Sequence, residues 1–259
     1  MVDLLCKGDR IGPIDGVLFD KDGTLSHSEP HLLKLAEARI ATALELWIAW
    51  GKPESACDTL HRNLKQAFGW NQSGLDPAGT LAVASRRDNL TSMATVFCLM
   101  NCSWPEAHRL AMDSFNRVDQ SLSDRPELVN PLLPGTAELI QKLVAAGTKL
   151  AVISNDTERG IQQFLKSHGL SKSFQTCWSA DHSPAKPDPE AVVQLCAQLD
   201  LEPSMCALIG DAETDLQMAT ASGVGLVIGY RGGWRSKPEL PSATHLIDDW
   251  NDLSIQLGT

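Results

Sequence analysis

The sequence predicts an α/β fold, a doubly wound (Rossmann-like) parallel sheet interrupted by an inserted all-helical domain. Three observations support it: short apolar runs alternate with helical patterns, three of those runs end in polar clusters, and one long stretch contains helical patterns alone. The chain has 259 residues, of which 43% are hydrophobic and 21% charged. That is enough to bury such a core without disulfides or metals.

The expected strands are apolar runs that are too short for helices. They are rich in Val, Ile and Leu and lack alternation with polar residues, which is typical of interior strands in a parallel sheet. These runs are Gly16 to Phe19, Lys149 to Ile153, Cys206 to Ile209, Gly225 to Ile228 and His245 to Ile247.

Helical patterns separate these strands, and three of the four end at a glycine, a common helix terminator. The expected helices are Thr136 to Ala146, Glu158 to His168, Pro189 to Leu199 and Thr214 to Ser222. In a doubly wound sheet, ligands bind beyond the carboxyl ends of the strands. The polar clusters that follow three strands are therefore the candidate site.

The stretch between the first and second expected strands is different in character. It holds amphipathic helical patterns at roughly 31–50, 54–68, 78–100 and 105–121, punctuated by prolines. We therefore predict an α/β domain of residues 1–25 and 135–259, interrupted by an all-helical insert of residues 26–134.

Charge and cysteine content exclude several function classes. The net charge of −10 repels nucleic acid and anionic membranes, so neither is an expected partner.

No apolar window reaches the ~18 residues of a membrane span, and the first ten residues lack a signal peptide. Seven cysteines without a C-x-x-C motif favour a reducing cytoplasm. Cys98 and Cys102 lack the further ligands of a zinc site, so buried thiols are expected.

The first polar cluster is Asp20-Lys21-Asp22-Gly23-Thr24. In an extended segment alternate side chains share a face, so Asp20 and Asp22 should point the same way and Lys21 the opposite way. Two neighbouring carboxylates need a cation or a shared proton, which indicates a metal or acid/base site. A calcium loop is excluded because its glycine and glutamate positions hold Leu25 and His31.

Three further clusters each have an ordinary structural interpretation when taken alone. Ser154-Asn155 precedes a helix and could bind an anion or simply form a turn. Lys186 lies before Pro187 and could be solvated. Asp211 and Asp215 flank a helix start, where a carboxylate is commonly a cap.

Together, and in this order, the four clusters resemble the motifs of the haloacid dehalogenase superfamily. The insert between the first and second motifs resembles the helical cap of its phosphoglycolate-phosphatase-like branch. The resemblance spans the whole α/β core and implies a phosphoric monoester hydrolase. It departs from the common pattern at Lys21, where relatives often have an apolar residue, and at Ala212, where they often have Thr or Ser.

The resemblance also implies roles for individual residues. Asp20 would attack the phosphate and form an aspartyl-phosphate, while Asp22 would protonate the leaving group and later deprotonate water. The remaining roles are phosphate binding by Thr24, Ser154, Asn155 and Lys186, and Mg²⁺ binding by Asp20, Asp22 (through its carbonyl), Asp211 and Asp215.

The implied substrate is a small phosphorylated metabolite, with 2-phosphoglycolate as the default. Asp22 disfavours a dehalogenase or a phosphonatase, whereas a phosphomutase and a catalytically silent binding module remain alternatives. Arg86 and Arg87 are candidate substrate contacts in the cap, with solvated surface residues as the competing interpretation. The sequence makes no prediction of oligomeric state.

Overall fold

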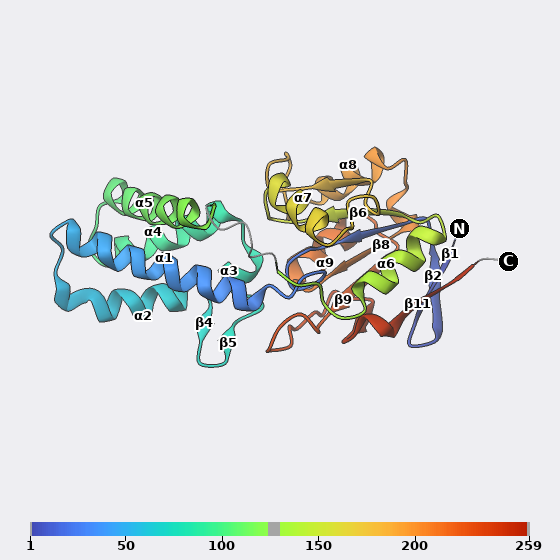
Figure 1. The fold of residues 1–259 in the computed structure, drawn as a ribbon, viewed down its shortest axis with the longest axis horizontal. Helices are drawn as coiled ribbons and strands as arrows, with labels where there is room; N and C mark the ends of the chain where they lie inside the picture. Colours follow the sequence, from blue (N-terminus) through green and yellow to red (C-terminus); the bar gives the residue numbers. More distant parts are fainter. Residues whose placement is uncertain (1, 124–129, 258–259) are drawn as a thin grey trace. The chain divides into compact units, whose positions relative to one another are not determined.

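The structure is a computed structural model that describes residues 2–123 and 130–257 (Figure 1). The chain divides into an α/β unit, Met1–Ser28 with Asn130–Thr259, and a helical unit, Glu29–Val129. The boundaries expected from the sequence lie a few residues nearer the α/β core. Ser26 forms backbone bridges with Asp22 and Leu132. These bridges hold both connecting segments in the α/β unit.

The α/β unit is built on a six-stranded parallel sheet of order β10-β9-β8-β3-β6-β7, which confirms the predicted fold class. Strand β3 lies at the centre because it pairs with both β6 and β8. The three-residue β7 has no counterpart among the predicted strands. The strands are β3 Gly16–Phe19, β6 Lys149–Ile153, β7 Thr176–Trp178, β8 Cys206–Gly210, β9 Leu226–Tyr230 and β10 His245–Ile247.

Helices connect the strands, close to where the sequence predicts them. They are α6 Thr136–Ala145, α7 Glu158–Ser167, α8 Pro189–Gln198 and α9 Glu213–Ala221. The Thr157 side chain caps α7 by accepting a hydrogen bond from the Gly160 N–H, and the Asp188 side chain caps α8 through the Glu190 N–H. Residues of α8 and α9 share one buried cluster with residues of β3 and β8, so both helices lie on the same face of the sheet.

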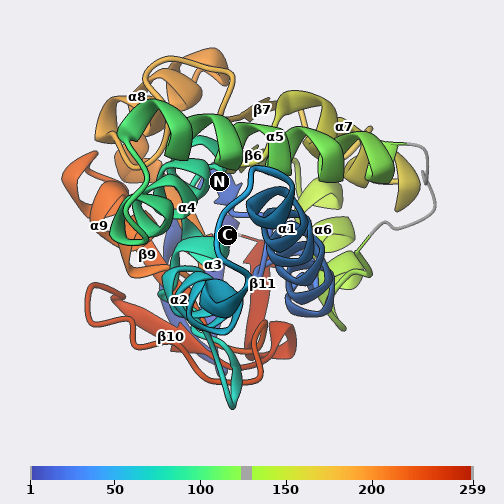
Figure 2. The same cartoon turned by 90° about the vertical axis from the view of Figure 1, so that its left-hand side faces the viewer.

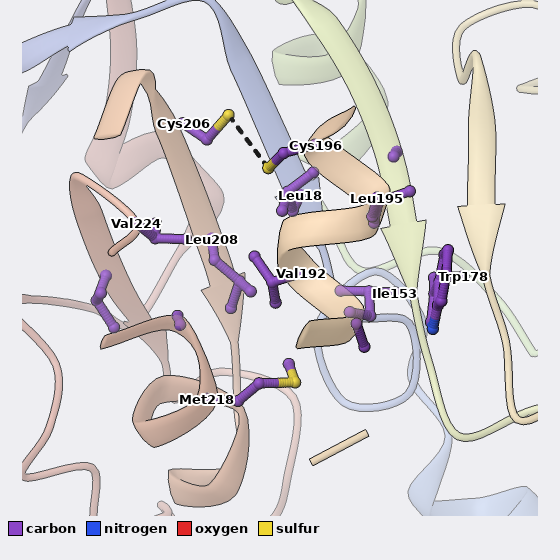
Figure 3. Packing of buried hydrophobic residues seen from close by; sticks show 14 of the residues in the cluster. Leu18, Ile153, Trp178, Val192, Leu195, Cys196, Cys206, Leu208, Met218 and Val224 are labelled. Atoms are coloured by element: carbon purple, nitrogen blue, oxygen red, sulfur yellow. Dashed lines mark hydrogen bonds between the residues drawn. The ribbon is translucent and has the colours of Figure 1, made fainter. Parts of the chain in front are cut away.

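A hydrophobic cluster fixes that face (Figure 3). Leu18 of β3 and Leu208 of β8 are fully buried in it together with Val192 of α8. The thiols of Cys196 and Cys206 lie 3.8 Å apart in the same cluster. All seven cysteines belong to the described residues and are free thiols; Cys102 is buried, as expected, whereas Cys98 is half-buried. The packed cluster makes the central strands a rigid base for the side chains at their ends.

A second sheet of three antiparallel strands has the order β11-β1-β2, and the sequence analysis missed it. Its strands are β1 Val2–Cys6, β2 Asp9–Ile14 and β11 Leu253–Leu257. Strand β2 has charged and exposed residues at its start and a proline within it, so it lacks the signal of a buried strand. Pairing of β1 with β11 joins the two ends of the chain.

The helical unit contains α1 Glu29–Ala49, α2 Cys57–Ala67, α3 Thr80–Val83, α4 Arg86–Leu99 and α5 Trp104–Ser123. Within it α5 packs on α1 and α4 (Figure 2). The prediction of an all-helical insert is wrong at one place, where β4 Trp70–Asn71 and β5 Gly74–Leu75 form a hairpin. The Asn71 side chain accepts hydrogen bonds from the Ser73 N–H and hydroxyl and so holds the turn.

The described part of the chain also forms three short 3₁₀ helices: Glu54–Ala56, Pro203–Met205 and Trp250–Asp252. Within residues 2–123 and 130–257, none of the helices combines the length and the apolar composition of a membrane span.

Candidate active site

The candidate site lies at the carboxyl ends of β3, β6 and β8, three adjacent strands of the central sheet. Phe19 is in register with Val152 of β6 and with Ile209 of β8. The next residue, Asp20, continues the ladder by donating its N–H to the Ile209 carbonyl at 2.9 Å. Parallel pairing therefore delivers the first, second and fourth polar clusters to one edge of the sheet.

Lys186 joins two of the predicted site carboxylates. Its Nζ lies 2.7 Å from Asp20 Oδ1 and 2.8 Å from Asp215 Oδ2, and all three side chains are buried. Burial alone would lower the pKa of Lys186, but the charges of Asp20 and Asp215 outweigh it and hold that pKa above its ordinary value. The lysine thus stays charged and binds the loop after β3 to the start of α9.

Asp211 lies beside this group with both oxygens occupied by donors. The Thr24 hydroxyl donates to Oδ1 at 2.8 Å, and the Trp234 indole N–H donates to Oδ2 at 2.5 Å. Burial and the charge of Asp20 raise the pKa of Asp211 well above its usual range, against the hydrogen bonds from Trp234 and Thr24. The Thr24 hydroxyl thus contacts Asp211 of the fourth motif, and its role in phosphate binding stays a prediction.

The carboxylates of this group carry more negative charge than Lys186 balances. Burial raises the pKa of Asp215 to about 6 even though Lys186 opposes the shift. In the conformation described, no three His, Cys, Asp or Glu side chains of residues 2–123 and 130–257 surround one point closely enough to hold an ion. The excess charge and the all-oxygen donor set nonetheless match the chemistry of Mg²⁺.

Asp22 has different partners from Asp20. Its Oδ2 lies 2.6 Å from Lys21 Nζ, and its Oδ1 accepts hydrogen bonds from the hydroxyls of Ser28 and Ser26 at 2.5 and 3.3 Å. Burial by itself would raise the pKa of Asp22, but the Lys21 charge and these hydrogen bonds hold it below its ordinary value. The two carboxylates of the first motif are therefore bound to different lysines.

The expectation that Lys21 points away from its acidic neighbours is wrong. It assumed an extended chain, but β3 ends at Phe19 and the N–H groups of Leu25 and Ser26 both donate to the Lys21 carbonyl. The chain turns at this point, so the alternation of a strand no longer holds. The Lys21 side chain returns to Asp22 and also reaches Asp156 at 3.2 Å.

Ser154 and Asn155 follow β6, beside β3, as the sequence predicts. Ser154 is buried, and its hydroxyl accepts a hydrogen bond from the Asp156 N–H at 3.2 Å. Asn155 is half-buried. Both residues precede α7, whose first turn begins after the Thr157 cap.

A glycine loop after β9 supports the first motif, and the sequence analysis missed it. Gly23 has a φ of +83°, and a Cβ there would overlap Asp211 and Trp234. A Cβ on Gly233 would overlap the Gly23 carbonyl. The two loops can pack this closely only because both positions are glycine. The Gly-Gly-Trp run after a strand was the available signal.

The two cap candidates have different environments. Arg86 donates through Nε to Asp119 Oδ2 at 2.7 Å and through Nη2 to Asn116 Oδ1 at 3.2 Å, so it links α4 to α5. The buried Arg39 packs on the Phe115 ring at 3.9 Å and lies 3.6 Å from the same Asp119. Arg87 is exposed. Of the two, Arg86 is engaged in packing the helical unit.

Comparison with known proteins identifies similar sequences over nearly the whole chain. A family model described as haloacid dehalogenase-like hydrolase matches residues 14–223. A protein of Salmonella typhimurium named phosphoglycolate phosphatase is 27% identical, over 96% of this chain and 95% of its own length. One from Pseudomonas putida with the same name is also 27% identical, over 92% of this chain and 77% of its own length.

Solved structures show the same fold. A predicted phosphoglycolate phosphatase from Haemophilus somnus 129pt superposes with a TM-score of 0.66 at 18% identity, covering 93% of this chain and 97% of its own. A putative beta-phosphoglucomutase from Thermotoga maritima gives 0.58 at 20% identity, with 92% and 96% covered. At these identities the likeness concerns the fold alone.

Proposed function

The chain belongs to the haloacid dehalogenase-like hydrolases, and from that premise we propose that it is a magnesium-dependent phosphatase acting on a small phosphorylated metabolite. The observation that carries the proposal is the buried contact of Lys186 with Asp20 and Asp215 beside Asp211. The names of the relatives make 2-phosphoglycolate the first substrate to test. Free thiols suit a reducing compartment, so the proposal places the enzyme in the cytoplasm.

Asp20 is the proposed nucleophile. One carboxylate oxygen attacks phosphorus, the bond from phosphorus to the ester oxygen breaks, and the leaving oxygen takes a proton from Asp22. Water then gives a proton to Asp22 and attacks phosphorus, which breaks the acyl-phosphate bond and regenerates Asp20. The lowered pKa of Asp22 makes the carboxylate its resting form. A bound phosphate ester adds negative charge nearby and favours the protonated form that the first step needs.

Donors at the strand ends are proposed to bind the transferred phosphoryl group. Lys186 is charged and buried, so its interaction with non-bridging oxygens is screened little by water. Ser154 and the Asn155 N–H lie at the end of the adjacent strand, and Thr24 orients Asp211. A single general acid/base accounts for about 10²- to 10⁴-fold in rate, so these charges must supply much of the acceleration.

Magnesium fits the donor set by charge and by ligand chemistry. The residues proposed to hold it are Asp20, Asp211 and Asp215 through their side chains and Asp22 through its carbonyl. When bound, the ion supplies positive charge that offsets the carboxylates and the phosphate ester. The raised pKa values of Asp211 and Asp215 arise first from burial and then from the charge of Asp20, and a bound cation would offset both effects.

The first experiment is the release of phosphate from an aryl phosphate with and without Mg²⁺, followed by a panel of phosphate esters ranked by kcat/KM. If the protein is a magnesium-dependent phosphatase, it releases inorganic phosphate only when Mg²⁺ is present. A phosphomutase instead returns an isomerised sugar phosphate, and a silent binding module gives neither product. If 2-phosphoglycolate ranks far below sugar or nucleotide phosphates, it is not the substrate, while the phosphatase proposal stands.

A further inference from the structure

Lys21 is a buried cation that the proposed chemistry does not use. Its side chain is 6% exposed, and its Nζ lies 2.6 Å from Asp22 Oδ2 and 3.2 Å from Asp156 Oδ2. The same ammonium group lies 5.6 Å from the centre of the Phe164 ring. Two carboxylates and an aromatic ring thus surround Lys21. An apolar side chain at this position would need no charged partner.

Burying this lysine is costly unless its charge is matched. An ammonium group loses much of its favourable hydration inside a protein, and only close partners compensate for that loss. Asp22 and Asp156 provide that match, and their charges raise the pKa of Lys21 against the effect of burial. Lys21 therefore keeps its positive charge, which lies next to Asp22, the carboxylate proposed to transfer protons.

Asp22 is held from two sides. Lys21 binds Oδ2, while the hydroxyls of Ser28 and Ser26 donate to Oδ1. The Ser28 hydroxyl lies 2.6 Å from that of Ser26 and accepts a hydrogen bond from the Asn130 amide at 3.2 Å. With both oxygens anchored, the Asp22 carboxylate is confined to one orientation.

Lys21 also connects two loops of the site. Asp156 lies two residues after Ser154, and its Oδ1 accepts a hydrogen bond from the Thr157 N–H at 2.7 Å, so it is fixed at the start of α7. The contact between Lys21 and Asp156 therefore spans from the loop after β3 to the loop after β6. Proton transfer needs its donor and acceptor within a few tenths of an ångström of the productive geometry.

We propose that Lys21 is a positioning residue for Asp22, fixing the orientation of that carboxylate relative to the phosphate-binding loop after β6. The inference rests on the proposed phosphatase function for its catalytic consequence. Its structural content, that Lys21 keeps Asp22 in one conformation, does not depend on which phosphate ester is the substrate.

The kinetic test compares Lys21→Met with Lys21→Arg and Asp156→Asn. Lys21→Met preserves side-chain length without charge and should lower kcat by about 10- to 100-fold while KM changes less than about threefold. Lys21→Arg should restore most of kcat. Asp156→Asn keeps the contact between Lys21 and Asp22 but removes the charge that links Lys21 to the loop after β6, so its kcat should fall clearly less than that of Lys21→Met. If Lys21→Met does not fold, Lys21→Gln replaces it with the same expectation.

The second readout is a crystal structure of the Lys21→Met variant, or of Lys21→Gln in its place. Asp22 should occupy more than one conformer there, while the contact between Asp20 and Lys186 remains. A single unchanged Asp22 conformer, or wild-type kcat in the variant, overturns the inference. Equal losses of kcat in Lys21→Met and Asp156→Asn would also overturn it. They would indicate that Lys21 acts only by linking the loops after β3 and β6 through Asp156, and not by holding Asp22. A wild-type enzyme that releases no phosphate would instead defeat the proposed function and leave the conformer result valid.

Discussion

The two halves of the first motif have opposite charge environments. On one side Lys186 is shared by Asp20 and Asp215, with Asp211 close by, so carboxylates outnumber the lysine and burial raises the pKa values of Asp211 and Asp215. On the other side Lys21, Ser26 and Ser28 surround Asp22 and lower its pKa. The surroundings of Asp20 contain fewer cations than carboxylates, as is expected for a cation-binding site. The charge of Asp22, by contrast, is already balanced by Lys21.

The largest expected effect is at Asp20. Asp20→Asn preserves the shape of the side chain but removes the nucleophilic oxygen anion, so kcat for phosphate release should fall by about 10⁴-fold or more. Steady-state turnover of an aryl phosphate in saturating Mg²⁺ measures it. Asp188→Asn, at the cap of α8, is the matched control and should keep near wild-type kcat. Full activity in Asp20→Asn would end the covalent mechanism.

The next largest effects, on stability and on kcat, are expected when Lys186 or Lys21 is replaced. Lys186→Met leaves Asp20 and Asp215 buried without their cation, which should lower the free energy of unfolding by about 3–5 kcal/mol and kcat by about 10²- to 10³-fold. Lys21→Met should cost less stability, because the Asp156 side chain is 33% exposed and water can solvate it. Urea unfolding without Mg²⁺ measures both variants. A larger loss of stability in Lys21→Met would reverse the comparison.

The pH dependence of Mg²⁺ binding follows from the raised pKa of Asp215. A folded-state pKa of about 6 means that a proton competes with the cation below pH 6 and leaves as the pH rises. The apparent Kd for Mg²⁺ should therefore increase about tenfold between pH 7 and pH 5 for this one group. Titration calorimetry measures it, with Asp215→Asn as the variant that should lose the share of the dependence due to Asp215 and keep the share due to Asp211. A Kd that is constant over this range contradicts the assignment.

The smallest effects are expected at the two candidate arginines of the helical unit. Arg86→Met removes the contacts to Asp119 and Asn116 and should cost about 1 kcal/mol of stability with unchanged KM. Arg87→Met should change stability by less than about 0.5 kcal/mol. Thermal unfolding and KM are measured for both. A rise of KM above about fivefold in either variant would identify that arginine as a substrate contact.

The sequence was most informative where burial is continuous and least informative where the chain turns. Apolar runs such as Lys149–Ile153 coincide with strands because both faces of a central parallel strand are buried. The family expected from the four polar clusters is confirmed by the match over residues 14–223. By contrast, β2 is partly exposed and holds a proline, and β4 and β5 have two residues each, so none of them leaves a periodic pattern.

Side-chain partners within the site were harder to predict than its location. The order of the strands brings Asp20, Ser154 and Asp211 to one edge, which a βαβ alternation implies. The contact of Lys21 with Asp22 depends on a turn that begins immediately after Phe19. The contact of Trp234 with Asp211 joins residues in different loops. The first contact has no signature in local sequence, and for the second the Gly-Gly-Trp run marks the loop but not its partner.

The central claim, that Asp20 is the nucleophile and Asp22 the proton-transfer group, is tested most directly by trapping the phosphoenzyme. The wild-type enzyme is mixed with an aryl phosphate and Mg²⁺, quenched in acid within milliseconds, digested and analysed by mass spectrometry with fragmentation of the first-motif peptide. The account predicts a phosphoryl group on Asp20 that disappears as turnover proceeds. A phosphoryl group on Asp22, or turnover with no modified peptide while Asp20→Asn retains activity, would contradict it.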